Sequence, residues 1–273
     1  MPLVKDSLPG RGDGLTLIPR PMKLQAYFDD SGQCDQAVGG CVASVEAWSS
    51  FETEWKHELD RFDVEWFHAV DFENRKHEFA RVSESDRTLF LTALLEALVR
   101  NVRPIAGGSF VCAIAGPDLV ENLRERGIRG KNAPKRGKTP QEKWIGRMVE
   151  TLSDPYSVCL GHALKVTFEL AIGGQDIIHV FIAHQPNRTE NIKYIHKMLR
   201  GTHRFNERLA GFDYGREMQP KDILPLQAAD FVAYYFSKKK RNPSNSRAWV
   251  ADKLQPQFLT IVRDPGWLTE GWV

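Results

Sequence analysis

Two adjacent carboxylates stand at the end of a strand-like segment near the start of the chain. In QAYFDDSG an alternating apolar pattern leads to Asp29 and Asp30, and Ser31 with Gly32 is expected to turn the chain. An acid at a strand end has its backbone fixed by the sheet and its side chain free at the rim, where α/β proteins keep their chemistry. The alternative is that both acids merely begin the turn, because Asp-Ser-Gly is good turn chemistry.

A second acid interrupts an apolar helical segment far along the chain. In PLQAADFVAYYF, Asp230 lies among Leu226, Ala229, Val232 and Ala233, which mark a buried side. An unpaired buried carboxylate is costly or becomes protonated, so Asp230 needs a partner, and a cation is the natural one. A salt bridge to an arginine is the alternative, although no basic residue lies one turn before Asp230 to form it locally.

Positive charge is concentrated in the segment 124–138, RERGIRGKNAPKRGK. Its basic residues stand against the single acid Glu125, its glycines keep it flexible, and a second cluster, KKKR, follows at 238–241. Such patches supply sequence-independent phosphate contacts, although a charge run is usually only a solvated loop. The residues expected to contact nucleic acid are Arg124, Arg126, Arg129, Lys131, Lys135, Arg136 and Lys138.

The elements that must position these residues alternate between strands and helices. Apolar periodicity predicts strands at 24–29, 37–48, 104–115, 164–172 and 177–183, the first two forming a hairpin. It predicts helices at 48–62, 83–100, 117–126, 139–152, 190–199 and 225–240, and leaves VEWFHAVDFEN unassigned. This order predicts an α/β domain with a central sheet covered by helices. We expect a flexible leader at 1–21 and one domain over 22–273, with the basic loop at 124–138.

Composition limits the class of protein. With 42% hydrophobic and 26% charged residues, the chain of 273 residues has the composition of a globular protein and not of a disordered or fibrous protein. Its apolar runs fall short of the roughly 20 residues that cross a bilayer, and its N-terminus lacks the apolar block of a signal peptide. We therefore expect a soluble, cytoplasmic protein that does not bind membranes. The cysteines form no CxxC pair and are expected to be buried free thiols.

Three short motifs, YFDDSG, FHAVDF and LQAADFVAY, occur in this order between Tyr27 and Tyr234. They resemble motifs of the mostly bacterial domain-of-unknown-function family 3800, which is grouped with the ribonuclease H-like fold. YFDDSG is similar to its opening Tyr-x-Asp-Glu-Ser-Gly, FHAVDF to its His-containing segment after the first helix, and LQAADFVAY to its closing Leu-Gln-x-Ala-Asp helix. The resemblance implies a ribonuclease H-like mixed central sheet flanked by helices.

The resemblance also implies a metal-dependent reaction. Ribonuclease H-like enzymes gather carboxylates from a first strand, an intervening segment and a late helix around one or two divalent ions. Carried over by position, Asp29 is the strand carboxylate and Asp230 the late-helix carboxylate, each both catalytic and a metal ligand. Bound Mg²⁺ or Mn²⁺ turns the repulsion between such acids into a ligand set, orients a phosphodiester and activates water.

Other residues are expected to complete this site. His68 and Asp71 lie three residues apart, so a helix would place them on one face as further ligands; the alternative is that His68 packs beside Trp66 and Phe67. His184, a catalytic candidate, stands where the later strand of the family ends in an acid. As a ligand, an imidazole suits Mn²⁺ or another transition metal better than Mg²⁺. The alternatives are that His184 contacts phosphate or is a plain loop residue. The residues expected to support the ligands are Asp30, Ser31, Glu73 and Gln227.

Two functions from different classes are therefore expected. The first is a divalent-metal-dependent nuclease or phosphodiesterase, a hydrolase that acts on nucleic acid. The second is a non-catalytic nucleic-acid-binding or assembly module that keeps the fold. The absence of an acid at His184 is the sequence feature that divides them.

Overall fold

The computed structural model describes residues 22–31, 37–102, 109–115, 139, 151, 154–172, 176–254 and 258–262, and the structural statements below concern these residues. The expected leader at 1–21, the expected helix at 117–126 and the whole basic loop at 124–138 lie outside them. Of the expected helix at 139–152, only Thr139 and Thr151 are described.

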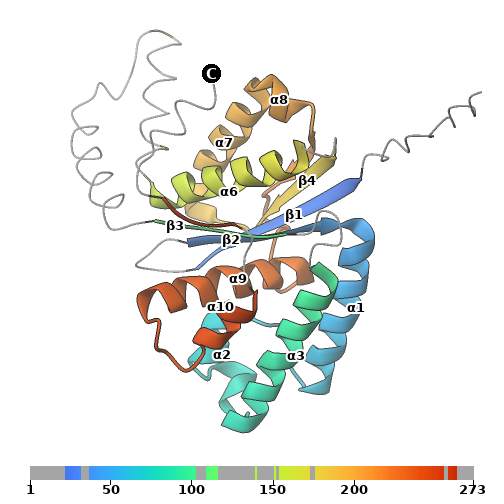
Figure 1. Cartoon of the computed structure of the whole chain (residues 1–273), viewed down its shortest axis with the longest axis vertical. Helices are drawn as coiled ribbons and strands as arrows, with labels where there is room; N and C mark the ends of the chain where they lie inside the picture. The colour runs from blue at the N-terminus through green and yellow to red at the C-terminus, as the bar shows by residue number, and fades with distance from the viewer. Residues whose placement is uncertain are drawn as a thin grey trace, which may run out of the picture.

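Six strands of the described chain form one mixed sheet between two layers of helices (Figure 1). Their order is β5-β4-β1-β2-β3-β6, in which β2 is antiparallel to β1 and β3, and the pairs β1–β4, β4–β5 and β3–β6 are parallel. This confirms the expected α/β class and the first hairpin. The strands are β1 (Lys23–Asp30), β2 (Ala37–Ser44), β3 (Ser109–Ala115), β4 (Ile177–Ile182), β5 (Leu209–Asp213) and β6 (Phe258–Val262).

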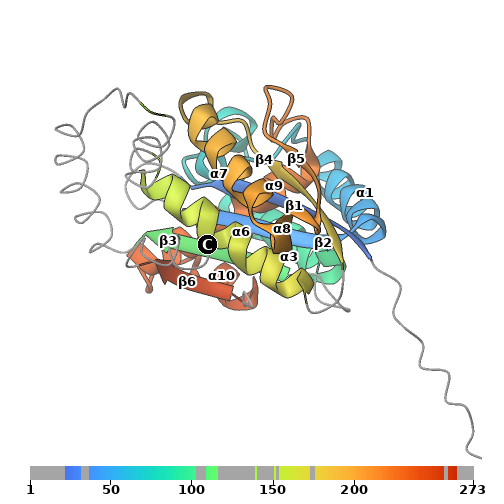
Figure 2. The same ribbon diagram turned by 90° about the horizontal axis from the view of Figure 1, so that it is seen from above.

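Helices cover both faces of the sheet. Figure 1 shows α6, α7 and α8 above the sheet and the other helices below it, and Figure 2 shows α6 lying along the strands. The upper layer consists of α6 (Pro155–Ile172), α7 (Thr189–Gly201) and α8 (His203–Asn206). The lower layer consists of α1 (Val45–Arg61), α2 (Ala69–Glu73), α3 (Glu84–Val102), α9 (Leu224–Arg241) and α10 (Ala248–Leu254). The described chain also has two short 3-10 helices, η1 (His77–Ala80) and η2 (Pro186–Arg188).

Each face of the sheet has its own hydrophobic core, and β1 contributes to both. Tyr27 belongs to the core on the α9 side, whereas Ala26 and Phe28 belong to the core on the α6 side. Side chains alternate along a strand, so Asp29 faces the α9 side and Asp30 faces the α6 side. The two neighbouring acids therefore lie in different surroundings.

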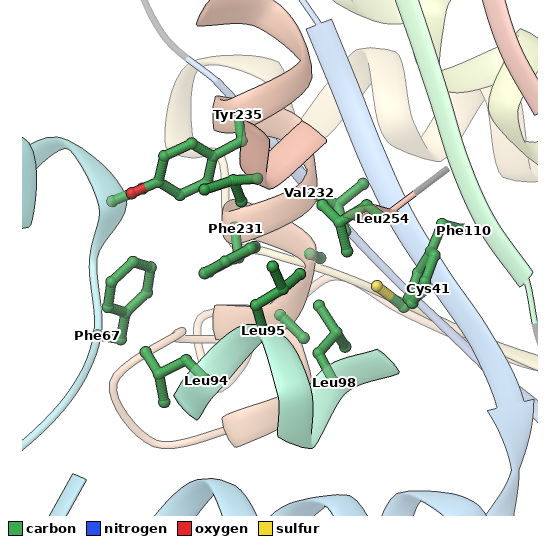
Figure 3. Packing of buried hydrophobic residues seen from close by; sticks show 14 of the residues in the cluster. Cys41, Phe67, Leu94, Leu95, Leu98, Phe110, Phe231, Val232, Tyr235 and Leu254 are labelled. Carbon is green, nitrogen blue, oxygen red and sulfur yellow. The ribbon is translucent and has the colours of Figure 1, made fainter. Parts of the chain in front are cut away.

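The core on the α9 side holds this helix against the sheet. Figure 3 shows its apolar side chains packed between α3, α10 and the segment before α2. Trp55 of α1 adds an edge-to-face contact with Phe231, whose ring centroid lies 6.1 Å away. The labelled residues of this core are Cys41, Phe67, Leu94, Leu95, Leu98, Phe110, Phe231, Val232, Tyr235 and Leu254.

A glycine lets α9 approach the sheet closely. A Cβ atom on Gly39 of β2 would lie 2.3 Å from the backbone nitrogen of Ala233, so any side chain there would push the helix away. Gly39 is the register partner of Asp29 in the hairpin. Because Asp230 precedes Ala233 by almost one helical turn, this contact brings Asp230 close to the end of β1.

The expected strand at 164–172 is wrong, because these residues form the second half of α6. α6 packs against the sheet and against α7, and a short apolar run such as this one does not distinguish a strand from a buried helix. A start signal is present in Asp154-Pro155. Asp154 accepts hydrogen bonds from the backbone N–H groups of Tyr156 and Ser157, both at 3.3 Å.

Most other expected elements are confirmed with shifted ends. The helices at 48–62, 83–100, 190–199 and 225–240 are α1, α3, α7 and α9, while the strand expected over 37–48 stops at Ser44, whose hydroxyl caps α1. The strand expected over 104–115 is described from Ser109 onward. β5, β6 and α10 were not expected. Cys41 and Cys112 are buried free thiols, and Cys159 is also buried. Among the described helices, none is both long and apolar enough to span a membrane.

Candidate active site

Asp29 is a buried carboxylate at the carboxyl end of β1. Asp29 is only 8% exposed, and its Oδ1 accepts a hydrogen bond from the backbone N–H of Asp30 at 2.8 Å. Burial raises its pKa well above the ordinary value, and the negative charges of Asp230 and Asp30 raise it further. Asp29 therefore lies within the electric field of an acid about two hundred residues away along the chain.

Asp230 lies in the middle of α9 and is 3% exposed. Its Oδ2 accepts a hydrogen bond from the backbone N–H of Ala69, the first residue of α2, at 2.7 Å. Burial raises its pKa to about 6; the charge of His68 and the Ala69 hydrogen bond act in the opposite direction. Among the described residues, the hydrogen-bond partner of Asp230 is thus a backbone amide at a helix start; the expected cation stays a prediction.

Neither Asp29 nor Asp230 forms an ion pair with any described residue. The alternative of a salt bridge between Asp230 and an arginine is therefore not found among the described residues. Two buried carboxylates that repel each other and lack a cation are electrostatically costly. A cation that bound between them would relieve both their repulsion and the cost of their burial.

Asp30, on the other face of β1, differs from Asp29 because it pairs with a cationic side chain. Its two oxygens accept hydrogen bonds from Gln185 Nε2 at 2.6 Å and Arg188 Nη1 at 3.1 Å. Burial raises the pKa of Asp30 and the Arg188 charge lowers it. Arg188 in turn stacks over the ring of Tyr156, 4.4 Å from its centroid, and lies 3.9 Å from Asp154 at the start of α6. Asp30 therefore ties β1 to η2 and α6, and its charge is compensated.

Two side chains on one turn of α9 hold the segment before α2. Gln227 Oε1 accepts a hydrogen bond from the backbone N–H of Phe67 at 3.0 Å, and Asp230 Oδ2 accepts the one from Ala69. Gln227 Oε1 also accepts from the indole N–H of Trp55 at 3.0 Å, and its amide donates to Pro220 O at 2.9 Å. Gln227 is fully buried with its polar atoms satisfied, so it supports the site by fixing the backbone.

His68 and Asp71 form a hydrogen-bonded pair beside Asp230. His68 Nδ1 lies 2.8 Å from Asp71 Oδ2, and the imidazole stacks on Trp66 with ring centroids 5.4 Å apart. The hydrogen bond and charge of His68 lower the pKa of Asp71 against the opposing effect of burial. The ring thus packs on Trp66, as one of the two alternatives for His68 predicted, and the role of His68 as a metal ligand stays a prediction.

Glu73, expected to support the ligands, is bound elsewhere along α9. Its carboxylate accepts hydrogen bonds from Tyr235 OH at 2.8 Å and from Lys238 Nζ at 2.7 Å. In the second basic cluster, Lys238 is thus paired with Glu73 and Lys239 with Asp252. These two lysines stabilise contacts within the protein, so the cluster at 238–241 offers less positive charge to a partner than its sequence indicates.

His184 and Ser31 flank the end of β1. The backbone N–H of Ala183 donates to Phe28 O at 2.9 Å, which places the residues after β4 beside those that end β1. His184 donates its backbone N–H to Met218 O at 2.7 Å. Its Nδ1 and the hydroxyl of Ser31 are buried, and neither has a hydrogen-bond partner among the described residues. Two polar side chains at this edge therefore have atoms that no described residue satisfies.

The two acids fit a divalent cation bound with few protein ligands. Within the described part of the chain, no group of three or more His, Cys, Asp or Glu side chains is arranged to hold a metal ion. Mg²⁺, however, is commonly held by one or two carboxylates together with waters and substrate phosphates. Asp230 Oδ1 accepts no hydrogen bond from a described residue and is open to such a role.

Sequence reasoning missed Gln185, Arg188 and Asp154. The polar run QPNR, which Ala183 and His184 separate from β4, was the available signal for Gln185 and Arg188. Its relevance depends on the parallel pairing of β4 with β1, which the sequence does not indicate. Comparisons with protein-family models, with curated proteins and with solved structures found no match, so the site is interpreted from its geometry and from the motifs.

Proposed function

We propose that this chain is a divalent-metal-dependent nuclease, a phosphodiesterase with a ribonuclease H-like core. One observation carries the proposal: Asp29 from the first strand and Asp230 from a late helix are buried within each other's field, with no cation from the described residues. Perturbed carboxylates of this kind concentrate at functional sites. The resemblance to family 3800 predicted a functional pair at the same two positions.

Asp29 and Asp230 would hold Mg²⁺ or Mn²⁺, which supplies Lewis-acid activation of a phosphoryl oxygen and of water when bound. The chain itself fixes the two carboxylates. The N–H of Asp30 orients Asp29, the N–H of Ala69 orients Asp230, and the contact of Gly39 with Ala233 sets the distance between strand and helix. Such preorganisation keeps a site within the narrow geometry that catalysis requires.

Nucleic acid is the proposed substrate because of the basic segment 124–138. Its seven lysines and arginines can neutralise phosphates without reading sequence. The second candidate function, a binding module without catalysis, is favoured by His184, since the end of β4 presents an imidazole where a third acid would complete a carboxylate site.

The test compares cleavage by the parent with that by Asp29→Asn and Asp230→Asn, on single-stranded, duplex and hybrid substrates with Mg²⁺ or Mn²⁺. Asparagine keeps the shape of the side chain and removes the charge that holds the ion. Asp176→Asn is the matched control, since Asp176 is 8% exposed and accepts a backbone N–H, from Met22, at 2.9 Å. It precedes β4 and so lies at the opposite end of this strand from His184.

The nuclease proposal expects cleavage by the parent and by Asp176→Asn, and a loss of at least about a hundredfold in both site variants. Cleavage that survives in Asp29→Asn and Asp230→Asn would refute the site and point to a contaminating nuclease. Binding without cleavage in all four proteins would favour the binding module.

A further inference from the structure

The backbone of His68 is held on both sides by α9. Gln227 accepts the N–H of Phe67 at 3.0 Å, and Asp230 accepts the N–H of Ala69 at 2.7 Å. These hydrogen bonds fix the residues immediately before and after His68, and one of them comes from the candidate metal ligand itself. The position of His68 relative to Asp230 is therefore set by direct bonds and not by a flexible loop.

The imidazole of His68 is also fixed. Asp71 binds Nδ1 at 2.8 Å, and Trp66 stacks on the ring with an interplanar angle of 13°. A carboxylate on Nδ1 holds the proton on that nitrogen and leaves Nε2 to exchange protons, as an aspartate does for a catalytic histidine. His68 remains 36% exposed at its side chain, so this pair is open to solvent and substrate.

The turn after α2 closes around Asp71 at a cost in backbone strain. Arg75 and His77 adopt φ angles of 53° and 51°, a region that residues other than glycine rarely occupy. Lys76 Nζ and His77 Nε2 then lie 3.7 Å and 3.9 Å from the Asp71 oxygens. Strained backbone of this kind clusters at functional sites. Burial raises the pKa of Asp71, but His68, Lys76 and His77 lower it, so the net pKa lies below its ordinary value. The role of Asp71 beside His68 requires this ionised carboxylate.

Phosphodiester hydrolysis needs a proton that the two buried acids lack. Asp29 and Asp230 are ionised when they hold a divalent cation, so neither can protonate the departing oxygen. His68 lies beside Asp230, and its imidazole is held by Asp71 at Nδ1 and by Trp66 on its face, which leaves Nε2 as the ring nitrogen that can exchange a proton. Resting on the proposed function, we propose that His68 is the general acid of this site, that its Nε2 protonates the leaving oxygen, and that Asp71 is its positioning residue.

The step balances without a further reagent. A water oxygen forms a bond to phosphorus, the bond between phosphorus and the leaving oxygen breaks, and the electron pair of that bond stays on the leaving oxygen. Nε2 of the imidazolium gives its proton to this oxygen, and the attacking water releases one proton to solvent. The neutral imidazole regains its proton from solvent before the next turnover.

The test compares two oligonucleotides at the mapped cleavage position, one natural and one with the leaving oxygen replaced by sulfur. A thiolate leaves without protonation, so a general acid matters only for the natural substrate. We expect His68→Gln and Asp71→Asn to cleave the natural substrate about a hundredfold or more slowly and the sulfur substrate at nearly the parent rate. His179→Gln is the matched control, because His179 pairs with Asp213 at 2.6 Å and is 37% exposed, close to the 36% of His68.

If His68→Gln loses the same fraction of its cleavage rate on both substrates, or loses none on either, the proton-donor role is overturned. The nuclease proposal still stands in that case, provided that cleavage depends on Asp29. If Asp29→Asn cleaves as fast as the parent, the nuclease proposal itself is refuted. Nitrogen-15 NMR of labelled histidine tests the pair without turnover. The neutral ring of His68 should carry its proton on Nδ1 in the parent and lose this preference in Asp71→Asn; a mixture of tautomers in the parent would overturn the assignment.

Discussion

Replacing Asp230 with asparagine is expected to stabilise the metal-free protein at neutral pH while abolishing cleavage. Asparagine keeps an oxygen for the Ala69 N–H and removes the charge that repels Asp29. The pKa of Asp230 rises from the ordinary 3.8 to about 6, chiefly through burial. Each pKa unit corresponds to about 1.4 kcal/mol, so ionising Asp230 in the folded state costs about 3 kcal/mol of stability.

The sign of the pH dependence follows from the raised pKa. A folded carboxyl that binds its proton more tightly than the unfolded one stabilises the protein below pH 3.8, and this contribution is lost as the pH rises through about 6. Asp230→Asn has no such proton to lose. The difference in unfolding free energy between variant and parent should therefore be close to zero near pH 4 and reach up to about 3 kcal/mol in favour of the variant above pH 7.

Urea unfolding at a series of pH values, with a chelator present, measures this difference. Asp176→Asn serves again as control and should show no gain, because Asp176 accepts the Met22 N–H and has no neighbouring acid among its described contacts. A variant less stable than the parent by the same amount at pH 5 and pH 8 would refute the reasoning. Asp230 would then be a structural cap of α2 and not an uncompensated charge.

Three further outcomes are expected. Millimolar Mn²⁺ should raise the melting temperature of the parent by preferential binding to the folded state, and an unchanged melting temperature, or the same rise in Asp29→Asn, would contradict a site at these acids. Gln227→Ala should destabilise the protein by about 2–4 kcal/mol in urea unfolding, because it leaves two buried N–H donors without their acceptor; a change below about 0.5 kcal/mol would show that the segment before α2 is not held by α9. Neutralising three residues of the basic loop should weaken nucleic-acid binding and reduce its salt slope by about 2–3 while the Mn²⁺ response is kept, and an unaltered slope would place the contacts elsewhere. These three residues are Arg129, Lys135 and Arg136.

The two acids were singled out from the sequence because each breaks a local pattern. Asp29 ends an alternating strand, and Asp230 interrupts an apolar helix, so both stand out without knowledge of the fold. The partner of Asp230 was not predictable, because the Ala69 amide comes from a short helix whose segment showed no clear periodicity. A backbone donor leaves no mark in the residue types.

The different fates of Asp29 and Asp30 were also beyond the sequence. They depend on which helix covers each face of β1 and on the parallel neighbour β4, which brings Arg188 to Asp30. Pairing between strands about 150 residues apart is a property of the topology and not of a local pattern. The error over 164–172 has a different cause: α6 packs against the sheet and α7 and is mostly apolar, and a short apolar run does not distinguish a strand from a buried helix.

The distance along the chain between Asp29 and Asp230 also orders events during protein synthesis. The β1–β2 hairpin can form as soon as residue 44 has left the ribosome, but the acid pair cannot exist until α9 packs on it. A chain stopped before residue 224 contains Asp29 without its counterpart. Nascent and truncated chains therefore lack the complete pair, and if the protein cleaves nucleic acid, ribosome-bound chains are harmless to the RNA around them until α9 has emerged.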